Sequence, residues 1–278
     1  MVKAQAYCPA SISLLFKRCL NDNIALTGSV GIGFTANKGV TAKVEQSDAN
    51  EIFFNSQKIN FPTVTDTIIM LTKHKVRVLL TSSIPLGYGF GLSGGSSLST
   101  AYAVNKLFNL GKTNEELALT SHTAEIKNHT GLGTVGTQST GGFLVKTVPG
   151  LPVHAITVEL IGQKIKAIVI DRLLTSGVLK SKNILNKVSL AADAILSNVL
   201  KQPKMTLNDY LDLSFEFVKQ ADLIQNEKVN SIIKQIKKDG GHATMAILGN
   251  VVLTTSEYLN FPFPTHSLTV VNDRIKLL

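Results

Sequence analysis

Short apolar stretches separated by polar turns predict several β-strands at the beginning of the chain. Residues 4–8 and 11–16 are half apolar, which is typical of short strands. Residues 30–46 predict two more strands joined by a turn at 37–39, where Asn-Lys-Gly interrupts the apolar pattern. Residues 51–61 predict another hairpin. The first half therefore begins with strands, and helices follow.

The apolar spacing changes to that of a helix further along the chain. Residues 65–74 predict a short helix, and 75–83 predict a strand bounded by Pro85. In residues 96–110 the apolar side chains recur at helical intervals, and Gly111 is expected to end that helix. A glycine-rich run thus lies between a strand and a helix.

A second helix is predicted over residues 114–129. Thr113 and Glu116 have the spacing of a capping box, in which each side chain bonds to the backbone of the other residue. Residues 131–142 form a second glycine- and threonine-rich segment, and a strand is expected immediately after it.

The strongest break in the chain is Pro-Gly-Leu-Pro at residues 149–152, where we place a domain boundary. It divides the chain into domains at 1–150 and 151–278. The second half has strand and helix patterns without regular alternation, which favours a two-domain α+β protein. Its expected strands lie at 155–160, 165–171, 243–249, 251–256 and 268–273, and its expected helices at 181–201, 206–220 and 227–239.

Composition narrows the class of protein. The chain has 278 residues, of which 44% are hydrophobic and 17% charged, as in a globular protein. Cys8 and Cys19 have no disulfide-framework or zinc-site spacing, which predicts a reducing, cytoplasmic location. Residues 1–16 contain no uninterrupted apolar region, and no later stretch approaches eighteen apolar residues. We therefore expect a soluble protein without a membrane partner.

The chain is basic, with a formal net charge of +9. Its lysines are spread along the sequence in no more than pairs such as Lys237-Lys238, and they are not interleaved with aromatic residues. That distribution argues against a nucleic-acid surface. It favours a generally basic surface suited to anionic metabolites.

The glycine-rich run at residues 82–102 is the main candidate site. A strand, a glycine-rich loop and a helix together form an anion site from backbone N–H groups and the helix dipole. Its five glycines allow close approach of a phosphate, and Ser93, Ser96 and Ser97 add hydroxyls. The run does not match the P-loop or GxGxxG patterns. A flexible surface loop or a tight packing turn would have the same composition.

Residues 85–97, Pro-Leu-Gly-Tyr-Gly-Phe-Gly-Leu-Ser-Gly-Gly-Ser-Ser, resemble the ATP-phosphate loop of the GHMP kinase superfamily, Pro-x-Gly-x-Gly-Leu-Gly-Ser-Ser. Phe90 stands for the leucine and Leu92 for the first serine. Residues 87–94 are most similar to the Gly-x-Gly-Phe-Gly-x-Ser-Gly loop of the archaeal pantoate kinases. The likeness extends to residues 28–40, 124–152 and 243–253.

This resemblance implies a fold, a reaction and a set of residues. The fold has an N-terminal domain like the second domain of ribosomal protein S5 and a ferredoxin-like C-terminal domain, with ATP between them. The reaction is phosphorylation of pantoate by ATP in coenzyme A biosynthesis. Ser93 and Glu125 are implied as catalytic residues and Mg²⁺ ligands. The implied ATP-binding residues are Pro85, Gly87, Gly89, Phe90, Gly91, Ser93, Gly94, Gly95 and Ser96.

The chain departs from the family pattern where charged groups are common. Thr134 stands where many of these kinases have an aspartate base, and residues 9–11 and 28–31 lack a basic side chain. Transfer would then rely on positioning and metal charge, or on another carboxylate. Ser29, Thr130 and Thr134 remain candidates for hydrogen bonds to the acceptor, and Arg18 or a nearby lysine could supply charge.

Several alternatives stay open at this point. The acceptor could be another small alcohol, such as mevalonate or homoserine, or the protein could bind a nucleotide without catalysis. Glu125 could be a solvated carboxylate that pairs with His122 or His129, both of which are expected on a helix surface. His242 could lie near the cleft or cap a helix. A homodimer is also possible.

Overall fold

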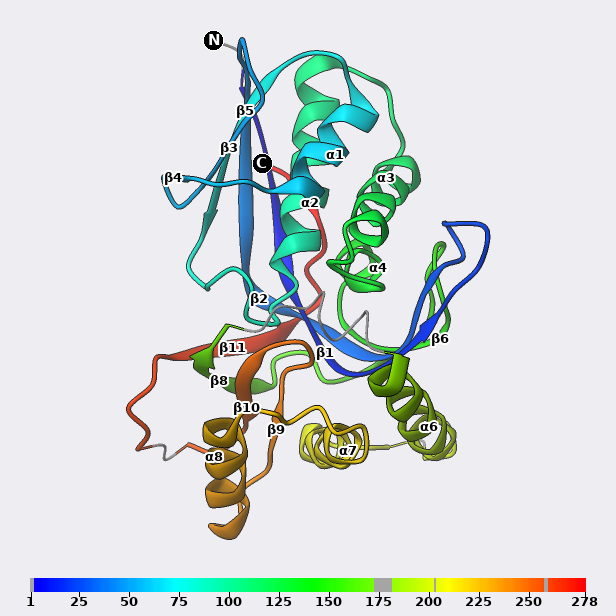
Figure 1. Cartoon of the computed structure of the whole chain (residues 1–278), viewed down its shortest axis with the longest axis vertical. Coiled ribbons are helices and arrows are strands. Elements are labelled where there is room, and N and C mark those ends of the chain that lie inside the picture. The colour runs from blue at the N-terminus through cyan, green and yellow to red at the C-terminus, as the bar shows by residue number, and fades with distance from the viewer. Residues whose placement is uncertain (1–2, 173–181, 203, 258–259) are drawn as a thin grey trace.

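The computed structural model describes residues 3–172, 182–202, 204–257 and 260–278. Figure 1 shows two groups of helices joined by a long pair of strands. The helices within residues 62–140 pack together at one end of these strands, and the helices within residues 182–238 lie at the other end. The mixture of helices and sheet confirms the predicted α+β class.

The longest elements are β1 (Lys3–Cys19) and β2 (Gly28–Gln46), which pair antiparallel over almost their full length. The two short strands predicted near the N-terminus are one strand, and so are the two strands predicted within residues 30–46. The predicted turn at 37–39 is wrong. Pro9 pairs with Gly39 but Ala10 pairs with Ala36, so the intervening residues form a bulge. Pro9 has no N–H to donate, which makes this a tolerable place to interrupt the ladder.

Five shorter strands extend the sheet around β2. On one side of β2 lie β5, β3 and β4, in that order, and β6 pairs with both β2 and β7. The hairpin predicted in residues 51–61 is confirmed: Asn55 and Ser56 turn between its strands with φ of 47° and 68°. The strands are β3 (Glu51–Phe54), β4 (Gln57–Lys58), β5 (Val76–Ser82), β6 (Phe143–Val148) and β7 (His154–Val158).

Four helices cover this sheet: α1 (Pro62–Leu71), α2 (Leu92–Phe108), α3 (Asn114–Lys127) and α4 (Thr134–Thr140). The capping box of Thr113 and Glu116 is confirmed at the start of α3. The last residue of helix α2 is Phe108, and its C-cap is Asn109 in the left-handed conformation, so the helix ends before Gly111, where the sequence predicted its end. It also begins earlier than predicted, within the glycine-rich run.

The second half adds a smaller sheet in the order β11-β8-β10-β9. Strand β11 also pairs with β2, which joins the two sheets. Two strands of the second half pair with strands of the first: β7 with β6, and β12 with β1. The domain boundary at 149–152 stays a prediction. The elements are β8 (Lys164–Asp171), α6 (Lys182–Val199), α7 (Leu207–Gln220), α8 (Glu227–Lys238), β9 (Ala243–Met245), β10 (Asn250–Thr254), β11 (Thr265–Val271) and β12 (Lys276–Leu277).

Two contacts fasten the second half onto β1. The Ser214 hydroxyl of α7 donates to the Leu14 carbonyl at 2.7 Å, and the N–H of Ile247 donates to the Ser13 carbonyl at 3.2 Å. The turn after β9 is thereby held beside the glycine-rich run. No helix in the described part of the chain is long and apolar enough to cross a membrane. The cytoplasmic location and the homodimer stay predictions.

Candidate active site

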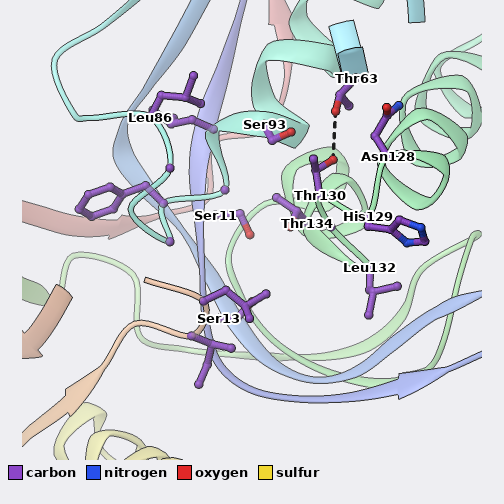
Figure 2. A pocket seen from close by; sticks show the side chains of 18 of the residues that line it. Ser11, Ser13, Thr63, Leu86, Ser93, Asn128, His129, Thr130, Leu132 and Thr134 are labelled. Atoms are coloured by element: carbon purple, nitrogen blue, oxygen red, sulfur yellow. Dashed lines mark hydrogen bonds between the residues drawn. The ribbon is translucent and has the colours of Figure 1, made fainter. Parts of the chain in front are cut away.

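A cavity of about 600 Å³ lies where the glycine-rich run meets the segment between α3 and α4. In Figure 2, Leu86 lies on one side of this cavity and Leu132 on the other, with Ser93 between them at the start of α2. The predicted site residues that line the cavity are Ser29, Gly87, Gly89, Phe90, Gly91, Ser93, Thr130 and Thr134. Those that do not line it are Pro85, Gly94, Gly95, Ser96 and Glu125.

Three glycines shape the loop before α2. Gly87, Gly89 and Gly91 have φ of 90°, 81° and 66°, in the left-handed region that favours glycine. A Cβ on Gly91 would lie 2.5 Å from the Ser11 carbonyl oxygen, so the loop also needs the space. The N–H of Ser11 donates to the Phe90 carbonyl at 3.0 Å. The loop is therefore a fixed turn against β1 and not a flexible segment.

The N-terminus of α2 is open for an anion. Gly91 is its N-cap, and no side chain among the described residues bonds to the N–H groups of the first turn. These groups have no acceptor within the helix, and the helix dipole gives them partial positive charge. Ser93, in this first turn, lines the cavity. Backbone N–H groups and dipole together form an oxyanion or phosphate site.

Gly94 and Gly95 belong to α2 itself and allow two side chains to approach the helix closely. A Cβ on Gly94 would lie 3.0 Å from Oε2 of Glu125, and a Cβ on Gly95 would lie 3.0 Å from Nε2 of Gln138. Gln138 Nε2 donates to the carbonyls of Pro9 at 2.8 Å and Gly91 at 3.0 Å. These glycines therefore permit close packing around the loop.

Glu125 is buried behind the cavity wall. Its Oε1 accepts a hydrogen bond of 2.7 Å from Thr130, whose own oxygen is 3.1 Å from the Thr63 hydroxyl (Figure 2). Thr130 has only one hydroxyl proton and gives it to Glu125, so Thr63 is the donor in the second bond. Burial raises the pKa of Glu125. The hydrogen bond from Thr130 and the proximity of the Ser93 hydroxyl, which makes no hydrogen bond of its own with the described residues, partly offset this effect.

Ser93 and Glu125 fit a divalent cation. Ser93 Oγ is buried without a hydrogen-bond partner among the described residues. Oε2 of Glu125 approaches the start of α2, where Ser93 lies, and a Cβ on Gly131 would overlap it. An unpartnered hydroxyl and a carboxylate are hard oxygen ligands of the kind that Mg²⁺ prefers. No cluster of three or more His, Cys, Asp or Glu residues occurs in the part of the chain that the structure describes.

A buried lysine lies behind the opposite wall of the cavity. Lys146 of β6 donates from Nζ to the Gly133 carbonyl at 2.9 Å, and burial lowers its pKa to about 8. A Cβ on Gly133 would overlap both this Nζ and the Ser29 hydroxyl, so both groups lie against the same glycine. The sequence predicted a charge from Arg18 or a nearby lysine without identifying the lysine. Neither Arg18 nor Lys146 lines the cavity, but Lys146 lies directly behind Gly133, which does.

The three histidines considered in the sequence, His122, His129 and His242, lie in three different environments. His122 is buried, which contradicts the prediction of a surface position, and its Nε2–H donates to the Thr27 carbonyl at 2.7 Å. Burial lowers the pKa of His122, and the charge of Lys146 lowers it further. His129 is exposed, at the cavity rim. His242 pairs through Nδ1 with Asp212 at 2.6 Å and does not line the cavity.

Several lining residues had no sequence signal. An apolar wall beside the loop includes Ile59, Phe61 and Leu86. Ile247 and Leu248 reach the cavity from the turn after β9, and Arg172 reaches it from the end of β8. Leu86 belongs to the glycine-rich run itself, whereas the others come from segments outside it, so only the fold brings them together.

Comparison with known proteins agrees with this geometry. Residues 62–142 match the family described as GHMP kinases N terminal domain. The chain is 31% identical to a pantoate kinase from Methanocaldococcus jannaschii, over 90% of this chain and 92% of that protein. The chain belongs to the pantoate kinase family of GHMP kinases. A pantoate kinase from Methanospirillum hungatei is 27% identical over 90% of this chain and 86% of its own length.

The fold of this pantoate kinase family member also matches solved structures. A phosphotransferase related to the CoA biosynthesis pathway superposes with a TM-score of 0.84 at 22% identity, over 99% of this chain and 98% of that one. This confirms the predicted two-domain GHMP kinase fold. Family membership also makes the chain a small-molecule kinase that uses ATP.

Proposed function

We propose that this chain transfers the γ-phosphoryl group of ATP to the 4-hydroxyl of pantoate, forming 4-phosphopantoate and ADP for coenzyme A biosynthesis. The observation that carries the proposal is one cavity with two kinds of wall. One wall is the uncapped N-terminus of α2 with its glycine loop, and the other holds Ser29 in front of Lys146. The first wall suits a phosphate chain, and the second suits a small hydroxy acid.

The nucleotide would occupy the side of the loop. The backbone N–H groups between Gly89 and Gly94 would bind its phosphates, because those in the first turn of α2 have no side-chain cap and no acceptor within the helix. The apolar side chains of Ile59, Phe61 and Leu86 offer a surface on which a flat base can be buried.

Ser93 and Glu125 would hold Mg²⁺. When bound, the ion would neutralise phosphate charge and orient the transferred group. Thr130 would serve here as a positioning residue, because its hydroxyl proton already binds Glu125. This differs from the direct contact with the acceptor that the sequence suggested for Thr130.

The acceptor would be held at the opposite wall. The Lys146 ammonium would pair with the pantoate carboxylate, and the Ser29 hydroxyl would bind the same end of the molecule. His122, through its bond to the Thr27 carbonyl, would keep the chain next to Ser29 in place. Thr134 begins α4 and lines the cavity, where it would pack against the acceptor.

The chain's own contribution to transfer is positioning. A threonine hydroxyl cannot accept a proton near neutral pH, so Thr134 is not a general base. The acceptor oxygen would attack the γ-phosphorus in line as the bond to ADP breaks, and a phosphate oxygen would take up the hydroxyl proton. Most of the rate would come from alignment and from neutralisation of charge.

The deciding experiment measures ADP release by purified protein with ATP, Mg²⁺ and one acceptor at a time. We expect turnover with pantoate, whereas pantothenate, mevalonate and homoserine should give no more than the rate without acceptor. Turnover only with mevalonate or homoserine would show a kinase with another substrate. ATP binding without turnover on any acceptor would show a nucleotide-binding protein without catalysis.

A further inference from the structure

Arg172 is the only Arg, Lys, Asp or Glu among the described residues that line the cavity. It follows Asp171, the last residue of β8, and reaches the cavity from the second half of the chain. The rest of the wall is made of apolar side chains, hydroxyls, amides, backbone and His129. A highly charged ligand in this cavity would meet one permanently charged side chain.

The guanidinium of Arg172 lies directly on the glycine loop. A Cβ on Gly87 would be 2.5 Å from Nε of Arg172 and 3.3 Å from its Cδ and Cζ. The absence of a side chain at Gly87 is therefore what leaves room for the guanidinium. Gly87 has φ of 90°, so glycine is favoured there on two grounds.

No acidic side chain among the described residues pairs with this guanidinium. Asp171 accepts a hydrogen bond of 2.7 Å from the backbone N–H of Arg172, and this bond does not involve the guanidinium. With the residues that the structure describes, the Arg172 side chain forms no hydrogen bond or ion pair. Five N–H donors at the cavity are thus available to a ligand.

We propose that Arg172 binds the phosphate chain of the nucleotide, a role that rests on the proposed function of the cavity. A guanidinium matches two phosphate oxygens at once, and the loop beneath it offers only neutral N–H dipoles. Arg172 lies against Gly87 on the loop side of the cavity, whereas Lys146 lies behind Gly133 on the opposite side. Leu86 and Leu132, the chain neighbours of these two glycines, mark the two sides in Figure 2. The two cations therefore serve different substrates, Arg172 the nucleotide and Lys146 the acceptor.

The test compares nucleotide affinities of the full-length protein by isothermal titration calorimetry in Mg²⁺ buffer. For Arg172→Gln we expect the Kd of ADP and of a non-hydrolysable ATP analogue to rise at least about tenfold. The Kd of adenosine and the KM of pantoate should stay within about twofold of wild type, and Arg172→Lys should fall between. Arg274→Gln, an exposed arginine that does not line the cavity, removes the same charge as a control.

Three results would overturn the proposal. One is an unchanged Kd of ADP in Arg172→Gln, and another is an equal loss of affinity for adenosine, which would indicate general damage to the cavity. A rise in the KM of pantoate with an unchanged Kd of ADP would assign Arg172 to the acceptor carboxylate. Because ADP binding needs no acceptor, the test stands even if wild-type protein fails to phosphorylate pantoate. Matching melting temperatures of all variants would exclude a folding defect.

Discussion

The Thr130 hydroxyl donates a 2.7 Å hydrogen bond to Oε1 of the buried Glu125 carboxylate. This bond satisfies one oxygen, and the other approaches the start of α2 next to Gly94. A buried carboxylate held in this way costs folding free energy, because burial disfavours its charged form. The raised pKa of Glu125 reflects that cost. Such an arrangement is typical of functional sites.

Replacing Glu125 by Gln should lower kcat by about 100-fold or more, because the charge that faces the phosphate site is lost. The free energy of unfolding should not fall by more than about 1 kcal/mol, since the buried charge is removed while the shape is kept. Ser93→Ala should likewise lower kcat strongly while leaving the free energy of unfolding nearly unchanged. Steady-state kinetics and urea denaturation measure both quantities. Glu216→Gln, an exposed change on α7, is the control, and near-normal turnover of either site variant would refute its metal role.

Replacing Gly91 by Ala should abolish measurable ATP binding, because the new Cβ would meet the Ser11 carbonyl and displace the loop. Gly111→Ala is a matched control: its φ of 67° is almost that of Gly91, at 66°, but nothing lies within 4 Å of its Cβ position. Both variants pay the conformational cost of a left-handed alanine, about 1 kcal/mol. Only Gly91→Ala should lose calorimetric ATP binding, and similar affinities of the two variants would contradict a fixed loop.

Lys146 should make acceptor binding pH-dependent. Its pKa is lowered to about 8, so the KM of pantoate should rise above that pH as the ammonium is lost. His122, which also faces Lys146, has a lowered pKa and is neutral over this range. Lys146→Met should raise the KM of pantoate at pH 7 at least about tenfold and remove its pH dependence above 8. Lys164→Met, an exposed change on β8, should do neither.

The same lysine should affect stability. Its folded pKa of about 8 lies below the usual 10.5, so between these values the unfolded chain binds more protons. The contribution of Lys146 to stability should therefore rise with pH over that window. Urea denaturation at several pH values should show this rise in wild type relative to Lys146→Met. A difference that is constant with pH would contradict a desolvated ammonium.

Replacing Gln138 by Leu should destabilise the protein by about 2 to 4 kcal/mol, because the buried carbonyls of Pro9 and Gly91 would lose their shared donor. Gln225→Leu, at an exposed position, should change stability by less than about 0.5 kcal/mol. Denaturant titration of both variants measures this, and equal stabilities would show that Gln138 does not fasten the loop.

Local signals predicted local features well. The capping box at Thr113 and the hairpin turn at Asn55 and Ser56 are confirmed, because a few neighbouring residues decide them. The turn expected at residues 37–39 failed for a different reason. Pairing of β1 with β2 on both sides of it outweighs the local preference, and the segment becomes a bulge.

The sequence by itself determined the family of this protein, its α+β class and the glycine loop. These depend on residues close together in the chain, where spacing decides which backbone conformation forms. Which charged groups lie around the cavity was decided by the tertiary structure alone. Lys146 and His122 lie in an ordinary strand and helix, and Arg172 directly follows a strand, none of them within a motif. Only burial, which shifts two of their pKa values, and packing against Gly133 or Gly87 distinguish them from the other basic residues of the chain.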